Sequence, residues 1–393
     1  MTTADLSLRS GVRLHARSVE IDPDFDLLDA YAAGGFAWIA GDEGFVASGR
    51  AAALDPGDAR AALAAIDHSC DGATPPGAGP RAVGALPFEV GGELVVPASI
   101  VGRDASGRAW RTIVEHADPG PRVESLAEQP APSEFRVSAA QSRAEWHAMI
   151  DQALACIRRG VIDKVVLARA VRIEADRPFD LPAVLAYLRR SQPGCFVYAD
   201  RGFVGASPEL LVRKTGSSIT SRPLAGTATD ATSLVRSAKD AHEHRLVVDA
   251  VVEALGRHCT AVRTDGPHPL QLADVTHLAT TVTARAGDVG LSVTDLVRTL
   301  HPTPAVGGTP RDAALEILRM LEPQARGRYA GPCGWVDRHG DGEFLVALRG
   351  GEIDGARAVV HAGAGIVAGS DPDAEWVETQ QKLTPMLQAL VRP

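Results

Sequence analysis

The grouping of strand-like segments along the chain is the feature that most constrains its fold. The apolar, β-branched run KVVLARAVRI at 164–173 predicts a long strand. Further strands are expected at 36–39, 93–96, 195–199, 203–206, 210–213, 275–284, 334–336, 343–349 and 358–362. Helical patterns occupy 58–66, 142–160, 181–190, 239–258, 293–300, 310–320 and 372–391. The strands cluster as hairpins and do not alternate strictly with helices, which favours an α+β fold over a doubly wound parallel sheet.

Length and composition limit the class of protein further. At about 150 residues per domain, 393 residues allow two domains or one large domain. The net charge of −9 is the opposite of what a general nucleic-acid binder carries, so we expect no nucleic-acid partner. Hydrophobic residues make up 45% of the chain, charged residues make up 23%, and no run of 18 apolar residues occurs. We therefore expect a globular protein with a large core and no membrane span.

Cysteine usage and the first residues bear on the compartment. The five cysteines form no CxxC pair and are odd in number, so neither a zinc framework nor a disulfide scaffold is indicated. Free thiols are typical of a reducing compartment. The initial segment MTTADLSLRSG lacks the basic and apolar pattern of a secretory signal. We expect a cytoplasmic protein.

The residues that carry chemical information lie in the second part of the chain. Two segments rich in Pro, Gly and polar residues, 71–80 and 118–133, predict loops or linkers. After them, the segment 142–160 predicts an amphipathic helix that begins with a capping box of Ser142 and Glu145 and ends at Gly160. The candidate functional residues all follow this helix.

Two charged residues beside apolar strands are candidates for acid–base catalysis. Lys164 opens an otherwise apolar strand, where desolvation would favour the neutral amine that accepts a proton; the alternative is a lysine whose ammonium reaches solvent from the strand end. Glu209, between Pro208 and Leu210, could stay protonated in an apolar pocket and act as a general acid. The alternative is a solvated glutamate in a turn, and the residues alone leave both alternatives open.

Two helices carry acidic pairs at a spacing of three residues. Asp240 and Glu243 lie early in one helix, and Glu375 and Glu378 lie early in the last helix. Carboxylates from two facing helices would suit a hard divalent cation that keeps several waters, as Mg²⁺ does. The alternative is that the acids simply complement the helix dipoles and that Glu378 forms a surface ion pair with Lys382.

The glycine-rich segment HAGAGIVAGS at 361–370 precedes the last helix. Its glycines could allow the backbone to approach an anionic ligand, with amides as donors. The segment does not match a dinucleotide-binding fingerprint, and no phosphate-binding loop motif occurs in the chain. Close strand packing explains these glycines equally well.

Together these motifs resemble, in type and order, the chorismate-utilising enzymes, and among them the isochorismate synthases of siderophore and menaquinone pathways. The matching segments span roughly residues 140–390, and the first 135 residues match less specifically. They are DKVVLAR (163–169), GASPELL (205–211), RPLAGT (222–227), KDAHEH (239–244), THLAT (276–280), HPTPAVGG (301–308), RGRYAGPCGW (326–335), ALRG (347–350), HAGAGIVAGS (361–370) and EWVETQQKL (375–383).

The resemblance implies a fold for the whole chain. It is a single large α+β domain of two stacked antiparallel β-sheets flanked by helices. Residues 1–135 would form an N-terminal portion of this fold, and residues 136–393 would form the chorismate-binding catalytic region.

The resemblance also implies residue roles in a reversible conversion of chorismate to isochorismate. Lys164 would activate a water that attacks C2 of the ring, and Glu209 would protonate the departing C4 hydroxyl. The Mg²⁺ cofactor, held against the C1 carboxylate, would be bound directly by Glu243 and Glu378, and through water by Asp240 and Glu375. Substrate would be bound by Gly226, Thr227, His277, Ala305, Arg349, Gly363 and Lys382.

Differences between subfamilies favour water as the nucleophile. Relatives that add an amine generally lack a lysine at position 164, and aminodeoxychorismate synthases commonly have a lysine where this chain has Ala225. Salicylate synthases share the lysine but usually have a threonine-containing sequence around position 305, so Ala305 favours release of isochorismate, while Val306 replaces the usual leucine. The alternatives are a salicylate synthase and a non-catalytic chorismate-binding relative. The resemblance also implies a monomer.

Overall fold

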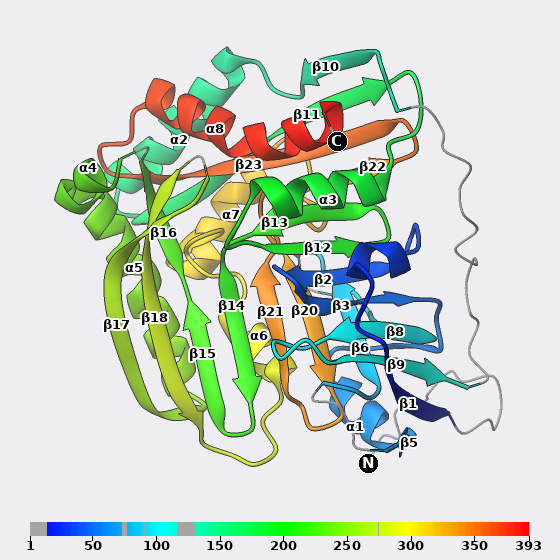
Figure 1. Ribbon diagram of the computed structural model, residues 1–393. Helices are drawn as coiled ribbons and strands as arrows, with labels where there is room; N and C mark the ends of the chain where they lie inside the picture. Colours follow the sequence, from blue (N-terminus) through cyan, green and yellow to red (C-terminus); the bar gives the residue numbers. More distant parts are fainter. Residues whose placement is uncertain are drawn as a thin grey trace.

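The computed structural model describes residues 14–72, 77–89, 91–115, 131–228, 230–273 and 275–392. The N-terminal segment, most of the predicted linker at 118–133 and part of that at 71–80 lie outside these residues. Two large β-sheets, with helices packed around them, make up the described chain (Figure 1). The predicted α+β class is confirmed.

The first sheet has 13 strands in the described residues. In spatial order they are β10 (Phe135–Ala139), β11 (Lys164–Ala175), β23 (Arg357–Val367), β22 (Gly350–Asp354), β13 (Phe203–Ser207), β12 (Phe196–Asp200), β2 (Phe36–Ala40), β3 (Glu43–Ser48), β8 (Ser99–Arg103), β9 (Ala109–Val114), β1 (His15–Ile21) and β5 (Asp67–Asp71), with β19 (Gly308–Thr309) also paired to β11. All pairs are antiparallel except β1 with β5.

The second sheet has ten strands in the same residues. Their order is β16 (Leu224–Ala228), β18 (Thr276–Ala286), β15 (Ser218–Arg222), β14 (Leu210–Thr215), β21 (Gly342–Val346), β20 (Pro332–Asp337), β6 (Arg81–Ala85), β7 (Leu94–Val96) and β4 (Ala52–Leu54), with β17 (Cys259–Gln271) paired to the other edge of β18. Strands from the first 115 residues extend both sheets, since β2 pairs with β12 and β6 pairs with β20.

The helices follow the sequence pattern closely. They are η1 (Leu27–Ala30), α1 (Ala59–Ala64), α2 (Arg143–Arg158), α3 (Leu181–Ser191), α4 (Ala231–Arg236), α5 (Ala238–Gly256), α6 (Val293–Leu300), α7 (Arg311–Leu321) and α8 (Pro372–Val391). The predicted capping box of Ser142 and Glu145 is present at the start of α2. No helix in the described part of the chain has the length and apolar character needed to span a bilayer.

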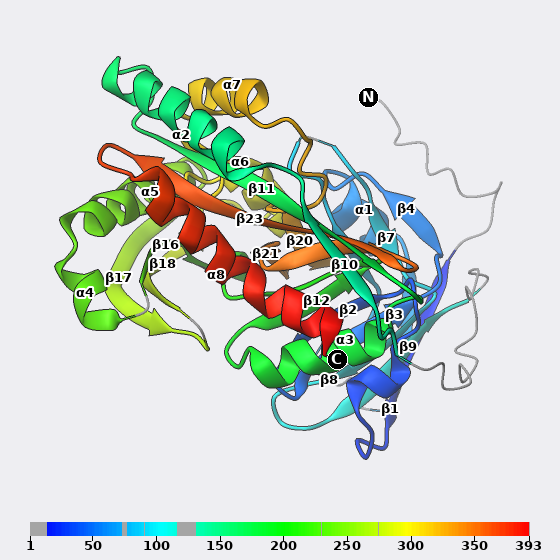
Figure 2. The ribbon, with the colours of Figure 1, turned by 90° about the horizontal axis from the view of Figure 1, so that it is seen from above.

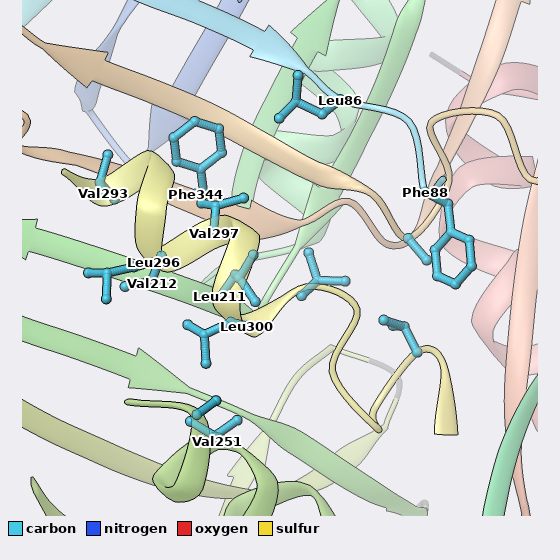
Figure 3. Packing of buried hydrophobic residues seen from close by; sticks show 14 of the residues in the cluster. Leu86, Phe88, Leu211, Val212, Val251, Val293, Leu296, Val297, Leu300 and Phe344 are labelled. Atoms are coloured by element: carbon cyan, nitrogen blue, oxygen red, sulfur yellow. The ribbon is translucent and has the colours of Figure 1, made fainter. Parts of the chain in front are cut away.

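Apolar packing fixes these elements around the second sheet. Helix α6 directs Val293, Leu296, Val297 and Leu300 towards Leu211 and Val212 of β14 and Phe344 of β21, as Figure 3 shows. All seven side chains are buried. At about 25 cal/mol per Å² of apolar surface removed from water, such a cluster contributes several kcal/mol to the fold. It holds β14 firmly, and β14 begins directly after Glu209.

Several strands, among them β15, β16, β17 and β22, were not predicted from the sequence, and the glycine-rich segment also differs from the expectation. Residues 361–367 of the glycine-rich segment are not a loop but the second half of β23, and β23 lies between β11 and α8 (Figure 2). Strand packing therefore accounts for the position of Gly363 and Gly365 beside β11, and the approach of an anionic ligand to their amides stays a prediction. Strand β17 escapes the sequence pattern because it contains Gly266, Pro267 and Pro269, which are tolerated at an exposed sheet edge.

Candidate active site

A narrow cavity of about 70 Å³ collects most of the candidate residues. Its walls come from β11, the turn before β14, β16, α5, β18, the 305–306 turn, the segments 326–330 and 348–349, β23 and α8. Ten of the predicted site residues line it: Glu209, Gly226, Thr227, Glu243, His277, Ala305, Arg349, Gly363, Glu378 and Lys382. The other three, Lys164, Asp240 and Glu375, stand directly behind this lining.

A second, larger cavity of about 880 Å³ contains none of these residues. Its walls carry several aromatic side chains and Arg81, which stacks on Phe45 and Trp335. The larger cavity also carries ion pairs, Lys214 with Asp341 and Arg213 with Glu343. We assign the site to the smaller cavity because the candidate residues from the matching motifs converge there.

Lys164 is fully buried at the first position of β11. Its backbone pairs with Val367 of β23 and Thr309 of β19, so the strand ladder fixes where the side chain starts. The Nζ atom lies 2.9 Å from Oε1 of Glu243 on α5. The alternative of a lysine reaching solvent is wrong, because the exposed fraction of the side chain is 0%.

The close approach of β23 makes this ion pair possible. A Cβ atom at Gly365 would lie 2.2 Å from Oε1 of Glu243 and 3.1 Å from Cε of Lys164. Only glycine leaves room for both charged side chains against this strand. The glycine-rich sequence thus serves the site by making space beside the backbone.

Glu209 is buried in the turn between β13 and β14. Its backbone carbonyl accepts a hydrogen bond from Val346 N–H at 3.1 Å, and its own N–H donates to Ser207 Oγ at 3.2 Å. Burial raises the pKa of Glu209 to about 8, although the charge of Lys164 opposes the shift. The alternative of a solvated turn glutamate is wrong, and the side chain is predominantly protonated at pH 7.

His277 and Arg349 form a second polar group in the cavity. Arg349 Nη2 lies 2.8 Å from His277 Nε2, and Gly226 O lies 3.1 Å from His277 Nδ1. Because arginine only donates, Nε2 accepts and the Nδ1 hydrogen points to Gly226. Burial, reinforced by Arg349, lowers the pKa of His277 to about 3, so the imidazole is neutral and acts as a fixed bridge between β16 and Arg349.

Thr227 and Ala305 complete the walls near this group. Thr227 Oγ1 lies 3.2 Å from Nδ1 of His277, and Gly226 adopts a positive φ of 74°, which a β-carbon would strain. Ala305 contributes only a methyl group beside the buried Val306. The 305–306 wall is therefore apolar.

The two candidate acids of α8, Glu375 and Glu378, are both paired with lysines. Glu378 Oε1 lies 2.6 Å from Lys382 Nζ, which also donates to the carbonyl of Gly363 at 3.0 Å. Glu375 is 1% exposed and accepts a hydrogen bond from Lys239 Nζ at 2.7 Å. Burial, followed by the charge of Glu378, raises the pKa of Glu375. The surface ion pair expected for Glu378 and Lys382 exists, but it lines the cavity.

The acids of α5 differ in depth. Glu243 is buried, and the charge of Lys164 lowers its pKa despite the opposing effect of burial, which is the largest single contribution. Asp240 is partly exposed, and its Cβ packs against Gly226. Ser237 caps the helix by accepting a hydrogen bond from Asp240 N–H.

Among the residues of the site that were not singled out from the sequence, Tyr329 and Lys239 make polar contacts there. Tyr329 lines the cavity, stacks on His361, and its hydroxyl is hydrogen bonded to the backbone N–H of Gly363. Lys239 bridges α5 to Glu375. Both lie inside matching motifs, RGRYAGPCGW and KDAHEH, so the motifs contained the signal although spacing alone could not assign it.

Comparison with known proteins identifies the family to which this chain belongs. The model of the family described as chorismate binding enzyme matches residues 101–391. The chain belongs to this family. The resemblance inferred from the motifs is therefore confirmed, and so is the prediction that the chain is an enzyme of this family.

The relatives include several isochorismate synthases. The chain is 38% identical to a putative isochorismate synthase MenF of Mycobacterium tuberculosis, over 85% of this chain and 90% of that protein. It is 41% identical to the salicylate biosynthesis isochorismate synthase of Pseudomonas aeruginosa, over 64% of this chain and 56% of that protein. The solved structure of the menaquinone-specific isochorismate synthase of Escherichia coli matches with a TM-score of 0.84 and 26% identity, covering 96% and 95% of the two chains.

Proposed function

We propose that this protein is an isochorismate synthase, an isomerase that adds water at C2 of chorismate and removes the C4 hydroxyl reversibly. The observation that carries this proposal is a buried lysine and a buried, protonated glutamate at one cavity. Lys164 is fully buried, and burial raises the pKa of Glu209 to about 8. One group takes a proton and the other gives one, as the overall reaction requires.

Lys164 is the proposed base that activates the water. In its neutral form it removes a proton from water as oxygen attacks C2, and the ammonium that results is stabilised by Glu243 at 2.9 Å. Glu209 is the proposed acid. Being predominantly protonated at pH 7, it transfers its proton to the C4 hydroxyl so that water leaves.

Cationic and amide groups provide the proposed contacts to the two carboxylates of chorismate. Arg349 is held in place by the neutral His277, and Lys382 is held by Glu378 and Gly363. Fixed donors of this kind bind carboxylates at small entropic cost. They also give an acidic protein local positive charge where an anionic substrate needs it.

The carboxylates suit a divalent cation in type and position. Among the described residues, no three carboxylate or imidazole side chains lie close enough to form a ready-made cage. Mg²⁺ does not need one, because it keeps several waters and takes one or two carboxylates together with substrate oxygens. We propose Glu243 and Glu378 as direct ligands, with Asp240 and Glu375 acting through water. A bound Mg²⁺ would neutralise the C1 carboxylate and polarise the ring.

A product assay tests the proposal. The protein is treated with a chelator and incubated with chorismate, with and without Mg²⁺, and the products are separated by liquid chromatography and mass spectrometry. Isochorismate formed only with Mg²⁺ is the expected result. Abundant salicylate with pyruvate would favour the alternative synthase, and binding of chorismate without turnover would favour a non-catalytic relative.

Location and assembly are part of the same proposal. All five cysteines are free thiols, in keeping with a cytoplasmic enzyme. The proposal includes a monomeric enzyme, as the family resemblance implies. Gel filtration with light scattering tests the second point.

A further inference from the structure

Lys239 occupies a position that the helix itself disfavours. It is the second residue of α5, where the positive end of the helix dipole repels a cation. The side chain crosses to α8, and Nζ lies 2.7 Å from Oε1 of Glu375. Glu375 also lies in the first turn of its own helix and is buried. The carboxylate of α8 therefore accounts for the location of this lysine.

Three lysines balance the three buried or half-buried acids of the site, and they differ in their access to solvent. Lys164 is 0% exposed, and Lys382 is 22% exposed and also bound to the carbonyl of Gly363. Lys239 is 35% exposed, and its ammonium interacts electrostatically with Glu243 and Glu378 as well as with Glu375. Of these three cations, Lys239 is the one with the freest path to water.

We propose that Lys239 is an internal counter-ion which a divalent metal must displace, so that Lys239 sets the metal affinity of the site. The inference rests on the proposed metal-binding function of the α5 and α8 carboxylates. One ammonium and one metal ion compete for the same acidic group, because both neutralise it. Lys239 can leave Glu375 without unfolding α5, since its side chain already reaches the surface. The lysine holds the acids together until metal replaces it.

Direct metal binding tests the inference without relying on turnover. Mn²⁺ is titrated into chelator-treated protein, and free Mn²⁺ is counted by electron paramagnetic resonance; Mg²⁺ binding is followed by calorimetry. Lys239→Met and Lys239→Gln should bind Mn²⁺ roughly three- to tenfold more tightly than wild type, the range expected for loss of a partly exposed competing charge. Lys239→Arg should stay close to wild type.

A matched control separates local competition from a general change in charge. Arg143 of α2 pairs at 2.6 Å with Asp373, which lies with Glu375 in the first turn of α8. This pair is exposed and lies outside the cavity lining. Arg143→Met removes one positive charge there and should change Mn²⁺ affinity by less than about twofold. Circular dichroism and thermal melting are used to check that each variant is folded.

The outcomes distinguish this inference from the function on which it rests. If wild-type protein binds neither ion, the metal site and the role of Lys239 both fail. If wild type binds Mn²⁺ and the Met and Gln variants bind it equally or more weakly, only the role of Lys239 fails, because the lysine then organises the acids instead of competing for them. An equal gain in Arg143→Met would also overturn it.

Discussion

The acidic pairs of α5 and α8 have the same spacing but opposite depths. On α5 the second acid, Glu243, is buried and the first, Asp240, is partly exposed; on α8 the first acid, Glu375, is buried and the second, Glu378, is half-buried. Glu243 shares its helix face with the buried Val247, one turn later. The comparison teaches that spacing selects a helix face, whereas packing against the sheets decides which acid is inside.

The two pairs also differ in the origin of their positive partners. Glu243 is balanced by Lys164 from a strand, and that lysine cannot reach water. Glu375 is balanced by Lys239 from the opposite helix, and Glu378 by Lys382 from its own helix. The lysine on the α5 side is therefore closed to solvent, while the two lysines on the α8 side are partly exposed.

Replacing Lys164, the positive partner of Glu243, should have the largest effect on activity. Lys164→Ala should lower kcat by about a thousandfold or more, because no other side chain at this position can take the proton of water. The measurement is the rate of isochorismate formation at saturating Mg²⁺. Near wild-type turnover in a folded Lys164→Ala protein would refute the assignment of the base.

Filling the space beside that pair should have the next largest effect. Gly365→Ala places a methyl group 2.2 Å from Oε1 of Glu243, so the carboxylate must move away from Lys164. We expect kcat to fall by roughly a hundredfold, since small displacements of catalytic groups are costly. Gly351→Ala in the neighbouring β22 is the matched control, because its Cβ would lie 2.7 Å from the carbonyl oxygen of Val359 but outside the cavity lining. Equal losses in the two variants would show that Gly365 has no special role.

The α8 acids should affect metal use more than chemistry. Glu378→Gln should raise the Mg²⁺ concentration for half-maximal activity roughly tenfold, and Glu375→Gln should raise it by a smaller factor, because only the first is a proposed direct ligand. A magnesium titration of the reaction rate measures both. If Glu375→Gln raises the required Mg²⁺ concentration more than Glu378→Gln does, Glu375 is the direct ligand and Glu378 acts through water. The more deeply buried acid would then bind the metal.

The smallest expected effect is a dependence of the reaction rate on pH, which reports on Glu209. The pKa of Glu209 is raised to about 8 by burial, so the proton donor is lost as pH rises through 8. The chemical rate at saturating substrate should fall severalfold between pH 7 and pH 9. A rate that stays level across this range in single-turnover experiments would exclude Glu209 as the donor.

The raised pKa of Glu209 also predicts how the stability of the fold depends on pH. Because the folded pKa lies above the unfolded value, Glu209 favours the folded state fully below the unfolded pKa, and this contribution is lost as pH rises through about 8. The melting temperature of wild type should therefore drop more from pH 7 to pH 9 than that of Glu209→Gln. Identical pH dependence of melting in both proteins would contradict burial of this carboxyl.

Local sequence signals predicted most helices to within two residues. Capping residues explain this success, because Ser142, Ser237 and Asp371 begin α2, α5 and α8 through side-chain hydrogen bonds that depend only on nearby backbone. Many strands were not recognised, among them β17 and the second half of β23. Both depend on pairing with a distant strand, and pairing partners leave no local trace in the chain.

The sequence by itself determined the fold class, the helix boundaries and, through the order of its motifs, the family and ten of the residues that line the cavity. Only the tertiary structure decided which lysine meets which acid, that His277 is a neutral support for Arg349, and that Tyr329 and Lys239 belong to the site. The physical reason is that charge and burial depend on distances between elements far apart in the chain. Lys164 and Glu243 form their ion pair only because β23 brings a glycine alongside them.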